Sequence, residues 1–122
     1  LSTEKRRTAL MNMSNLLEDG GILFLDVNNR YNAAHYGIKA AIKNIFKDSF
    51  RQSEKNGDFN FGVSIHGRFI KTPVHIFSPL EMEQLIKSAR LKIVQYRIVD
   101  YRTGKTVKNF WAGQLVYKLM KA

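Results

Sequence analysis

A short apolar run directly after a pair of glycines constrains the fold of this chain more than any other feature. Gly20-Gly21 is followed by Ile-Leu-Phe-Leu-Asp-Val-Asn at residues 22–28. Apolar residues occupy consecutive positions in this run, which is typical of a strand buried on both faces in the centre of a parallel sheet. The run is far shorter than the roughly 20 apolar residues of a bilayer-spanning helix. We therefore expect residues 22–28 to form an interior strand of an α/β sheet.

The segment before this strand has the spacing of an amphipathic helix. In residues 3–17 the apolar side chains recur at steps of three and four, at Ala9, Leu10, Met13, Leu16 and Leu17. Ser2 is placed to cap the start of this helix, and Gly20-Gly21 ends the segment because glycine tolerates a positive φ. A helix, paired glycines and a buried strand form half of an α/β unit.

The middle of the chain predicts a helix followed by a pair of strands. Residues 36–51 carry an apolar stripe and, at four-residue steps, a basic stripe of Lys39, Lys43, Lys47 and Arg51. Residues 52–58 are polar and predict a loop. Residues 59–65 alternate apolar and polar, which predicts a half-buried strand, and His66-Gly67 predicts a turn into a short partner strand at 68–71.

Ser78-Pro79-Leu80-Glu81 is the clearest signal for the start of a helix. Ser78 is placed as the N-cap, Pro79 suits the first helical position, and Glu81 would close a capping box. We expect this helix to run to about residue 89 and to turn Met82, Leu85, Ile86 and Ala89 inward.

The last third of the chain predicts two long strands. Residues 91–102 and 109–120 are rich in β-branched and aromatic side chains and favour an antiparallel hairpin, with Thr103-Gly104-Lys105 in the connection. We expect 109–119 to lie between 22–28 and 92–102, antiparallel to both. The other side of 22–28 would then face a missing N-terminal half or a partner chain, because a long apolar strand edge needs a cover.

Four segments, taken in order, carry a family resemblance. Residues 15–27 hold two leucines and two glycines before an apolar strand, and Asn28-Asn29-Arg30-Tyr31 follows. Residues 75–82 open a helix, and residues 88–91 end it with Arg90 before the next strand. Together they resemble the C-terminal half of a class I S-adenosylmethionine-dependent methyltransferase. Because Arg90 stands where this family usually has glycine, the helix is expected to end without its usual residue of positive φ.

The resemblance implies an α/β fold and an enzymatic function. The fold would be a partial Rossmann-like sheet, mostly parallel in the full domain, ending in an antiparallel strand pair and packed against helices. Residues 1–122 would be the C-terminal half of one methyltransferase domain, with 32–72 as an insert or lid. The reaction would transfer a methyl group from S-adenosylmethionine to an unidentified acceptor. The motifs that bind this cofactor would lie upstream of Leu1, so the fragment alone is expected to be inactive.

The candidate substrate site follows from the end of the strand at 22–28. Ligands of open α/β sheets lie beyond the carboxyl ends of the parallel strands. Asn28 and Asn29 are therefore candidates for hydrogen bonds to the acceptor, Arg30 for pairing with a carboxylate or phosphate, and Tyr31 for stacking on the acceptor. The alternative is that these four residues cap the strand and order the loop after it.

His35 is the nearest titratable base in sequence to this site. A histidine can accept a proton from an acceptor hydroxyl near neutral pH, so His35 is a candidate catalytic residue. Its alternative is an exposed loop histidine. His66 and His75 are expected to serve a turn and the start of a helix. The three histidines lack zinc-ligand spacing and the chain has no cysteine, so no metal site is predicted.

The charge of the chain supports a second hypothesis. The sequence has 20 basic and 10 acidic residues, a net charge of +10, and such a surface attracts nucleic acid. The basic stripe within 36–51 is then either a solvated helix face or a surface that follows phosphates. The alternative function is accordingly a small basic nucleic-acid-binding module without catalysis. The absence of cysteine and of a membrane span favours a cytoplasmic location.

Overall fold

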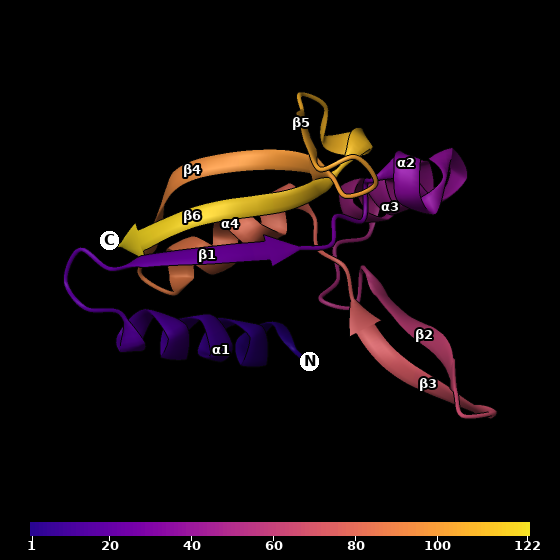
Figure 1. Ribbon diagram of the computed structural model, residues 1–122, viewed down its shortest axis with the longest axis horizontal. Helices are drawn as coiled ribbons and strands as arrows, with labels where there is room; N and C mark the ends of the chain where they lie inside the picture. Colours follow the sequence, from indigo (N-terminus) through magenta and orange to yellow (C-terminus); the bar gives the residue numbers. More distant parts are fainter.

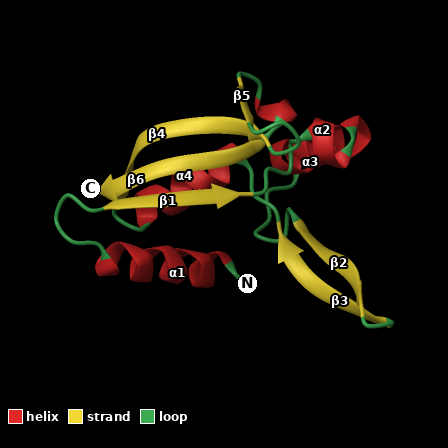
Figure 2. Ribbon diagram, in the orientation of Figure 1, coloured by secondary structure: helices red, strands yellow, loops and turns green.

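Two helices pack on one face of a four-stranded antiparallel sheet, and a helical pair and a hairpin extend from one end of it (Figures 1 and 2). The computed structural model describes residues 1–122. Its elements are α1 (Thr3–Leu16), β1 (Ile22–Val27), α2 (Ala33–Tyr36), α3 (Ile38–Phe50), β2 (Asp58–Ile65), β3 (Arg68–His75), α4 (Pro79–Ser88), β4 (Leu91–Asp100), β5 (Lys105–Val107), a 3₁₀ helix (Phe110–Ala112) and β6 (Gln114–Lys121). None of the helices is long and apolar enough to cross a bilayer.

The sheet has the strand order β1-β6-β4-β5, with β6 antiparallel to both of its neighbours. This arrangement confirms the predicted position of the last strand between the other two. The connection from β4 to β6 is longer than a simple hairpin, because β5 first folds back along the outer side of β4. β1 pairs with β6 alone, so its other edge has no partner strand. The sheet is therefore a partial one, as the sequence predicted.

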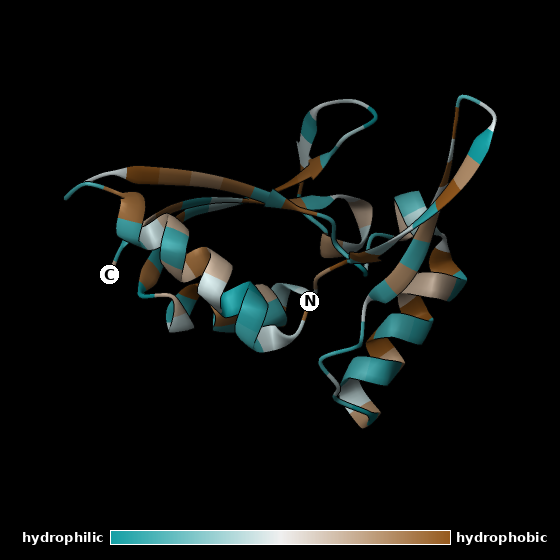
Figure 3. Cartoon of the chain, turned by 90° about the horizontal axis from the view of Figure 1, so that it is seen from below, coloured by the Kyte–Doolittle hydropathy of each residue, from teal (hydrophilic) through white to brown (hydrophobic).

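The hydrophobic core lies between the sheet and the two helices α1 and α4. Figure 3 shows from below that the two helices lie on the same side of the sheet. Alternate side chains of β6 and the inner face of α4 fill the core, with buried Leu10, Met82, Leu85, Ile86, Ala89, Leu91, Ile98, Leu115, Tyr117 and Leu119. The four predicted inward residues of α4 are all buried, which confirms the helical spacing there. The core thus fixes α4, and with it the segment that leads into α4.

β1 is buried on one face only, and the expectation of burial on both faces is wrong for these residues. Leu23, Leu25 and Val27 pack against the core. Ile22 and Phe24 point to the opposite face, where the Phe24 side chain is 70% exposed. The reason is that α1 and α4 both lie on the same side of the sheet.

α1 begins as predicted and ends at Leu16, one residue before the predicted end, and it buries a narrower face. The Lys5 N–H donates to the Ser2 Oγ at 3.4 Å, which is the expected N-cap. Its buried face is formed by Arg6, Leu10 and Ser14, at steps of four residues, whereas Leu16 is exposed. A buried arginine on this face was not predicted, because the apolar spacing alone predicted a different buried face, centred on Leu10, Met13 and Leu17.

The helix predicted at 36–51 begins at Ile38 and ends at Phe50, because Gly37, with a φ of 90°, separates it from a short helix that precedes it. α2 precedes this break and α3 follows it. The apolar stripe of α3 is mostly exposed, at Ile38, Ile42, Ile45, Phe46 and Phe50. The sequence predicted the amphipathic pattern correctly, but the apolar side of α3 is left largely uncovered.

β2 and β3 form a hairpin that projects away from the sheet (Figure 1). Its turn is at His66 and Gly67, with φ values of 49° and 76°, as a tight type I′ turn requires. The partner strand extends to His75, well beyond the predicted residue 71. The expected half-burial of β2 is wrong, because nearly all of its residues are exposed on both faces.

The residue after the C-cap of α4 takes a left-handed backbone conformation. Arg90 has a φ of 58°, so the expectation that the helix ends without positive φ is wrong. The Arg90 carbonyl accepts a hydrogen bond from the Ala122 N–H at 2.8 Å. An arginine therefore adopts the backbone geometry for which glycine is better suited.

Candidate functional site

The chain leaves the end of β1 beside the segment that enters α4. The Phe77 N–H donates to the Asn28 carbonyl, and the Arg30 N–H donates to the Phe77 carbonyl, both at 2.8 Å. These two bonds continue β1 by one parallel bridge, from Asn29 to Phe77. The buried face of α4 thus fixes the position of the predicted substrate residues.

Asn29 is fully buried and ties the end of β1 to the loop before β6. Its amide nitrogen donates to the Gly113 carbonyl at 3.0 Å and also to the Phe110 carbonyl. Its backbone N–H donates to the Gln114 Oε1 at 2.6 Å, and its Oδ1 accepts from the Tyr31 N–H at 3.0 Å. The side chain of Asn29 is therefore engaged by backbone groups.

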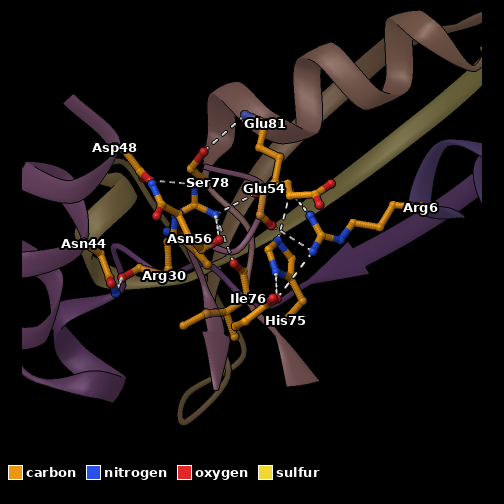
Figure 4. Close-up of polar contacts among 12 residues, drawn as sticks. Arg6, Arg30, Asn44, Asp48, Glu54, Asn56, His75, Ile76, Ser78 and Glu81 are labelled. Atoms are coloured by element: carbon orange, nitrogen blue, oxygen red, sulfur yellow. Dashed lines mark hydrogen bonds and ion pairs between the residues drawn. The ribbon is translucent and has the colours of Figure 1, made fainter. Parts of the chain in front are cut away.

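Arg30 lies at the centre of an ionic network, formed by Arg6, Arg30, Asp48, Asp58, His75 and Glu81 (Figure 4). The guanidinium is 5% exposed and meets Asp48 through two parallel bonds of 2.8 and 2.9 Å. Its Nη1 donates to Glu81 at 2.6 Å. Burial alone would lower the pKa of Arg30, but the hydrogen bonds to Asp48 and Glu81 raise it overall. The charge of Arg30 is thus matched within the chain.

Glu81 joins the two halves of the ionic network. Its carboxylate accepts from Arg6 at 3.0 Å and lies 2.9 Å from the His75 Nε2, in addition to the bond from Arg30. Burial would raise the pKa of Glu81, but the hydrogen bonds from His75 and Arg30 lower it below its ordinary value. The Glu81 N–H does donate to the Ser78 Oγ at 3.2 Å, so the predicted N-cap forms.

The sequence did not reveal the ionic network, because its members come from separate elements and several of its pairs are far apart in the chain. Arg6 and Glu81 are separated by 75 residues, and Arg30 and Glu81 by 51. The capping-box pattern also predicted a different partner for the Glu81 carboxylate, namely the backbone N–H of Ser78 at the start of the helix. No local spacing could have found these contacts.

Tyr31 faces the ionic network rather than open solvent. Its hydroxyl donates to the Asp48 carboxylate, and its ring meets Phe110 edge-on at a centroid distance of 5.8 Å. Burial and the contact with Asp48 raise the pKa of Tyr31 to about 12. The phenol therefore stays protonated near neutral pH and acts as a hydrogen-bond donor.

The predicted site residues line two separate depressions. Asn28 and His35 line a cavity of about 120 Å³, called the polar cavity below, together with Asn32, Ala34, Asp100, Tyr101, Arg102 and Gln114. Arg30 and Tyr31 line a groove of about 510 Å³ beside the starts of α1 and α4. Asn29 lines neither. The structure thus brings Asn28 and His35 together and separates them from Arg30 and Tyr31.

Asn32 in the wall of the polar cavity was not predicted as a site residue. Its side chain is 4% exposed, and its Oδ1 is buried without a hydrogen-bond partner. Nearby, Arg102 donates to both carboxylate oxygens of Asp100, at 3.2 and 3.0 Å, and these bonds lower the pKa of Asp100. His35 is exposed and meets the Tyr36 ring edge-on at 4.6 Å. No group of three or more acidic or histidine side chains is arranged to hold a metal ion.

Comparison with known proteins identifies the fold. No family model matches the sequence, and no curated protein is significantly similar to it. A SAM-dependent methyltransferase from Methanosarcina mazei matches 98% of this chain and 52% of its own, with 20% identity and a TM-score of 0.63. A S-adenosylmethionine-dependent methyltransferase from Clostridium acetobutylicum matches 98% and 52%, with 15% identity and a TM-score of 0.53. The CcbJ methyltransferase from Streptomyces caelestis matches 100% and 55%, with 12% identity and a TM-score of 0.58.

The chain therefore has a fold found in SAM-dependent methyltransferases and spans about half the length of these three structures. The resemblance noted in the sequence is confirmed at the level of the fold, and so is the partial sheet.

Proposed function

We propose that this chain is the acceptor-side, C-terminal half of an S-adenosylmethionine-dependent methyltransferase domain. The likeness in fold to three such enzymes supports the proposal. The observation that most supports a missing upstream half is the unpaired edge of β1. A strand in this position of the sheet has room for a neighbour, and the upstream half of the domain would supply one.

The cofactor contacts are proposed to lie in that upstream half. The polar cavity, at about 120 Å³, is too small for a nucleoside with an amino acid attached. The bound cofactor would supply an activated methyl group on a sulfonium. The side chains of this chain would bind and orient the acceptor, for which in-line positioning is the main requirement.

Within this proposal, the predicted site residues have two kinds of role. Asn28 and His35 line the polar cavity and would contact the acceptor, with His35 as the candidate to accept its proton. Asn29, Arg30 and Tyr31 are held by the chain itself and would position the walls of the site. Residues 32–72 would form the insert that covers the acceptor.

Calorimetry with S-adenosylmethionine tests this function. A polypeptide that continues upstream of Leu1 should bind the cofactor, and the 122 residues alone should bind it at least 100-fold more weakly. Asn28→Ala in the extended chain should leave cofactor affinity unchanged while reducing methyl transfer. An extended chain that binds no cofactor contradicts the proposal.

A second candidate function rests on the basic stripe of α3. Lys39, Lys43, Lys47 and Arg51 are all exposed, and none of them is paired with a carboxylate. Such a stripe could follow the phosphates of a nucleic acid. This function predicts that the chain binds a 20-mer RNA with an affinity that falls steeply between 50 and 200 mM salt. The double variant Lys43→Glu/Lys47→Glu should lose this affinity. Absent or salt-insensitive binding would remove it.

A further inference from the structure

The outward side of α3 exposes an apolar stripe, formed by Ile38, Ile42, Ile45, Phe46 and Phe50. The exposed fraction of these side chains ranges from 37% at Ile45 to 77% at Phe50. The rings of Phe46 and Phe50 stack on each other at a centroid distance of 5.7 Å, so they form one continuous apolar surface. Contiguous apolar side chains that remain exposed to water mark an interaction site.

The inward side of α3 is held by the ionic network. Ala41 is buried, and the Asn44 amide donates to the Arg30 carbonyl at 3.0 Å. Asp48 accepts two bonds from the Arg30 guanidinium. Asp48 is the only acidic residue of α3, and its charge is matched on this inward side. The outward side of α3 therefore carries no negative charge.

The basic stripe runs beside the apolar stripe along α3. Lys39, Lys43 and Lys47 each directly follow a residue of the apolar stripe, and Arg51 follows Phe50 at the end of the helix. Because successive residues of a helix are turned by about 100°, the two stripes are adjacent. All four basic side chains are exposed, and none is paired with a carboxylate.

This combination fits the surface of an anionic bilayer better than it fits a nucleic acid or a protein groove. A basic amphipathic helix lies in the membrane interface with its apolar face at the boundary of headgroups and acyl chains, while its lysines reach the headgroups. A nucleic acid would match the basic stripe and leave the apolar stripe in water. A groove that encloses a helix needs more than one free side, and the inward side of α3 is occupied. A planar partner needs the outward side alone.

The position of α3 separates it from the side on which the sheet is open. Figure 3 shows α3 apart from α1 and α4. In Figure 1, α3 lies level with β6, whereas the free edge of β1 faces the lower part of the view. A strand added to β1 would therefore extend the sheet away from α3.

We propose that the outward side of α3 is a membrane-binding surface that docks on an anionic lipid bilayer. The apolar stripe enters the boundary between headgroups and acyl chains, and the basic stripe lies among the anionic headgroups. This surface goes beyond the methyltransferase proposal and does not rest on it.

Flotation with lipid vesicles tests this proposal on the 122-residue chain and on a chain that continues upstream of Leu1. Both should bind vesicles of phosphatidylcholine with about 30% phosphatidylserine. Binding to phosphatidylcholine alone should be at least tenfold weaker, because each basic residue near an anionic surface adds about fivefold in affinity. Equal binding to both vesicles, or none to either, overturns the proposal. Binding by the 122 residues but not by the extended chain also overturns it, because the upstream half then covers α3.

Phe50→Ser tests the apolar stripe. It should weaken binding to the anionic vesicles at least fivefold, because it removes an aromatic ring from the interface. Leu16→Ser is the matched control, at an exposed apolar side chain at the end of α1, and should bind as the unmodified chain does. Undiminished binding by Phe50→Ser, or equal losses in the two variants, contradicts the proposal.

Lys43→Gln/Lys47→Gln tests the basic stripe. This double variant should bind the anionic vesicles at least tenfold more weakly. Lys105→Gln/Lys108→Gln removes the same charge from exposed positions in and after β5, and should weaken binding less than threefold. Equal weakening by the two double variants would show that the net charge, rather than α3, attracts the vesicles, and would overturn the proposal.

A fluorescent label reports whether α3 enters the interface. The chain has no cysteine, so Ser49→Cys accepts a single environment-sensitive label one turn after Ile45, next to the apolar stripe. On anionic vesicles the emission of this label should shift to the blue. The same label on Thr106→Cys, at an exposed position of β5, should show no shift. No shift at position 49, or an equal shift at both positions, overturns the proposal.

RNA is the other partner that a basic stripe can take, and its outcome is distinct. If α3 binds RNA instead, Lys43→Gln/Lys47→Gln loses affinity for a 20-mer RNA, Phe50→Ser keeps it, and the chain does not float with vesicles. That result overturns the membrane-binding surface and supports the second candidate function. Neither result bears on the methyltransferase proposal, which is tested by cofactor affinity.

Discussion

Tyr117 occupies the middle of the core with a hydroxyl that has no partner. The side chain is 1% exposed and its oxygen is buried without a hydrogen bond. Because an unsatisfied buried hydroxyl costs about 1–3 kcal/mol, Tyr117→Phe should raise the free energy of unfolding by about 1 kcal/mol. Urea denaturation measures this change. Tyr96→Phe, at a partly exposed ring that packs on Tyr117, should change stability by less than about 0.5 kcal/mol. A loss of stability in Tyr117→Phe would mean that a water satisfies the hydroxyl.

Glu81 should make the stability of the chain depend on acid pH. Burial raises its pKa, but the bonds from His75 and Arg30 lower it below the ordinary value. A carboxyl with a depressed pKa in the folded state stabilises fully above its unfolded pKa of about 4.3, and this stabilisation is lost as the pH falls through the folded value. Glu81→Gln should therefore cost about 2 kcal/mol at pH 7 and much less at pH 3.

Urea unfolding of both proteins from pH 7 to pH 3 measures this difference. The unmodified chain should lose more stability on acidification than Glu81→Gln does. Glu83→Gln is the control on the same helix, because Glu83 is exposed and takes no part in the ionic network. Parallel pH profiles for the unmodified chain and Glu81→Gln would show that the network contributes nothing to the acid response.

At the scale of elements, the sequence predicted those segments whose pattern is local. Ser78 and Pro79 mark the start of α4 whatever the helix packs against. In the structure Ser78 is the N-cap and Pro79 lies in the first turn, as predicted. The burial of a helix face could not be predicted in the same way, because it depends on which other elements pack against that face. The spacing in α3 is amphipathic, yet its apolar stripe is mostly exposed. Likewise Gly37 could be tolerated in a helix or could end one, and only its φ of 90° decides.

The hairpin of β2 and β3 should be the least stable part of the fold. It pairs with no further strand, and a two-stranded ribbon is marginally stable on its own. Amides of β2 and β3 should therefore exchange with deuterium at least 100-fold faster than those of β6, which has a partner on each side. Mass spectrometry of peptides from both regions measures the rates. Equal protection of hairpin and β6 would show that the hairpin packs against something in solution.

At the scale of the whole molecule, the order β1-β6-β4 was predictable because each strand carries its own pattern and the resemblance supplied their arrangement. The site was predictable only in part. The end of β1 gave Asn28 to Tyr31, but Asn32 and the members of the ionic network carry no pattern of their own. The network depends on tertiary contacts, some of them across more than 50 residues, such as Arg30 with Glu81. Such contacts exist only once the core has brought α1, α4 and β1 together.

The unpaired edge of β1 should govern how the isolated chain behaves in solution. An uncovered edge strand with exposed apolar side chains is a template for pairing with another copy, and a charge on that strand opposes such pairing. We expect the 122-residue chain to self-associate at micromolar concentration, and Phe24→Lys to weaken this association at least tenfold. Analytical ultracentrifugation measures both.

Phe69→Lys separates an effect of the strand edge from general stickiness. Phe69 is about as exposed as Phe24, at 67% against 70%, but lies on the hairpin. If the edge of β1 is the contact, Phe69→Lys leaves the association unchanged; if any exposed phenylalanine suffices, the two variants weaken it equally. A chain extended upstream should not self-associate, since its own strand would occupy the edge. Persistent association of that extended chain through β1 would mean that a second copy, rather than the upstream half, completes this sheet.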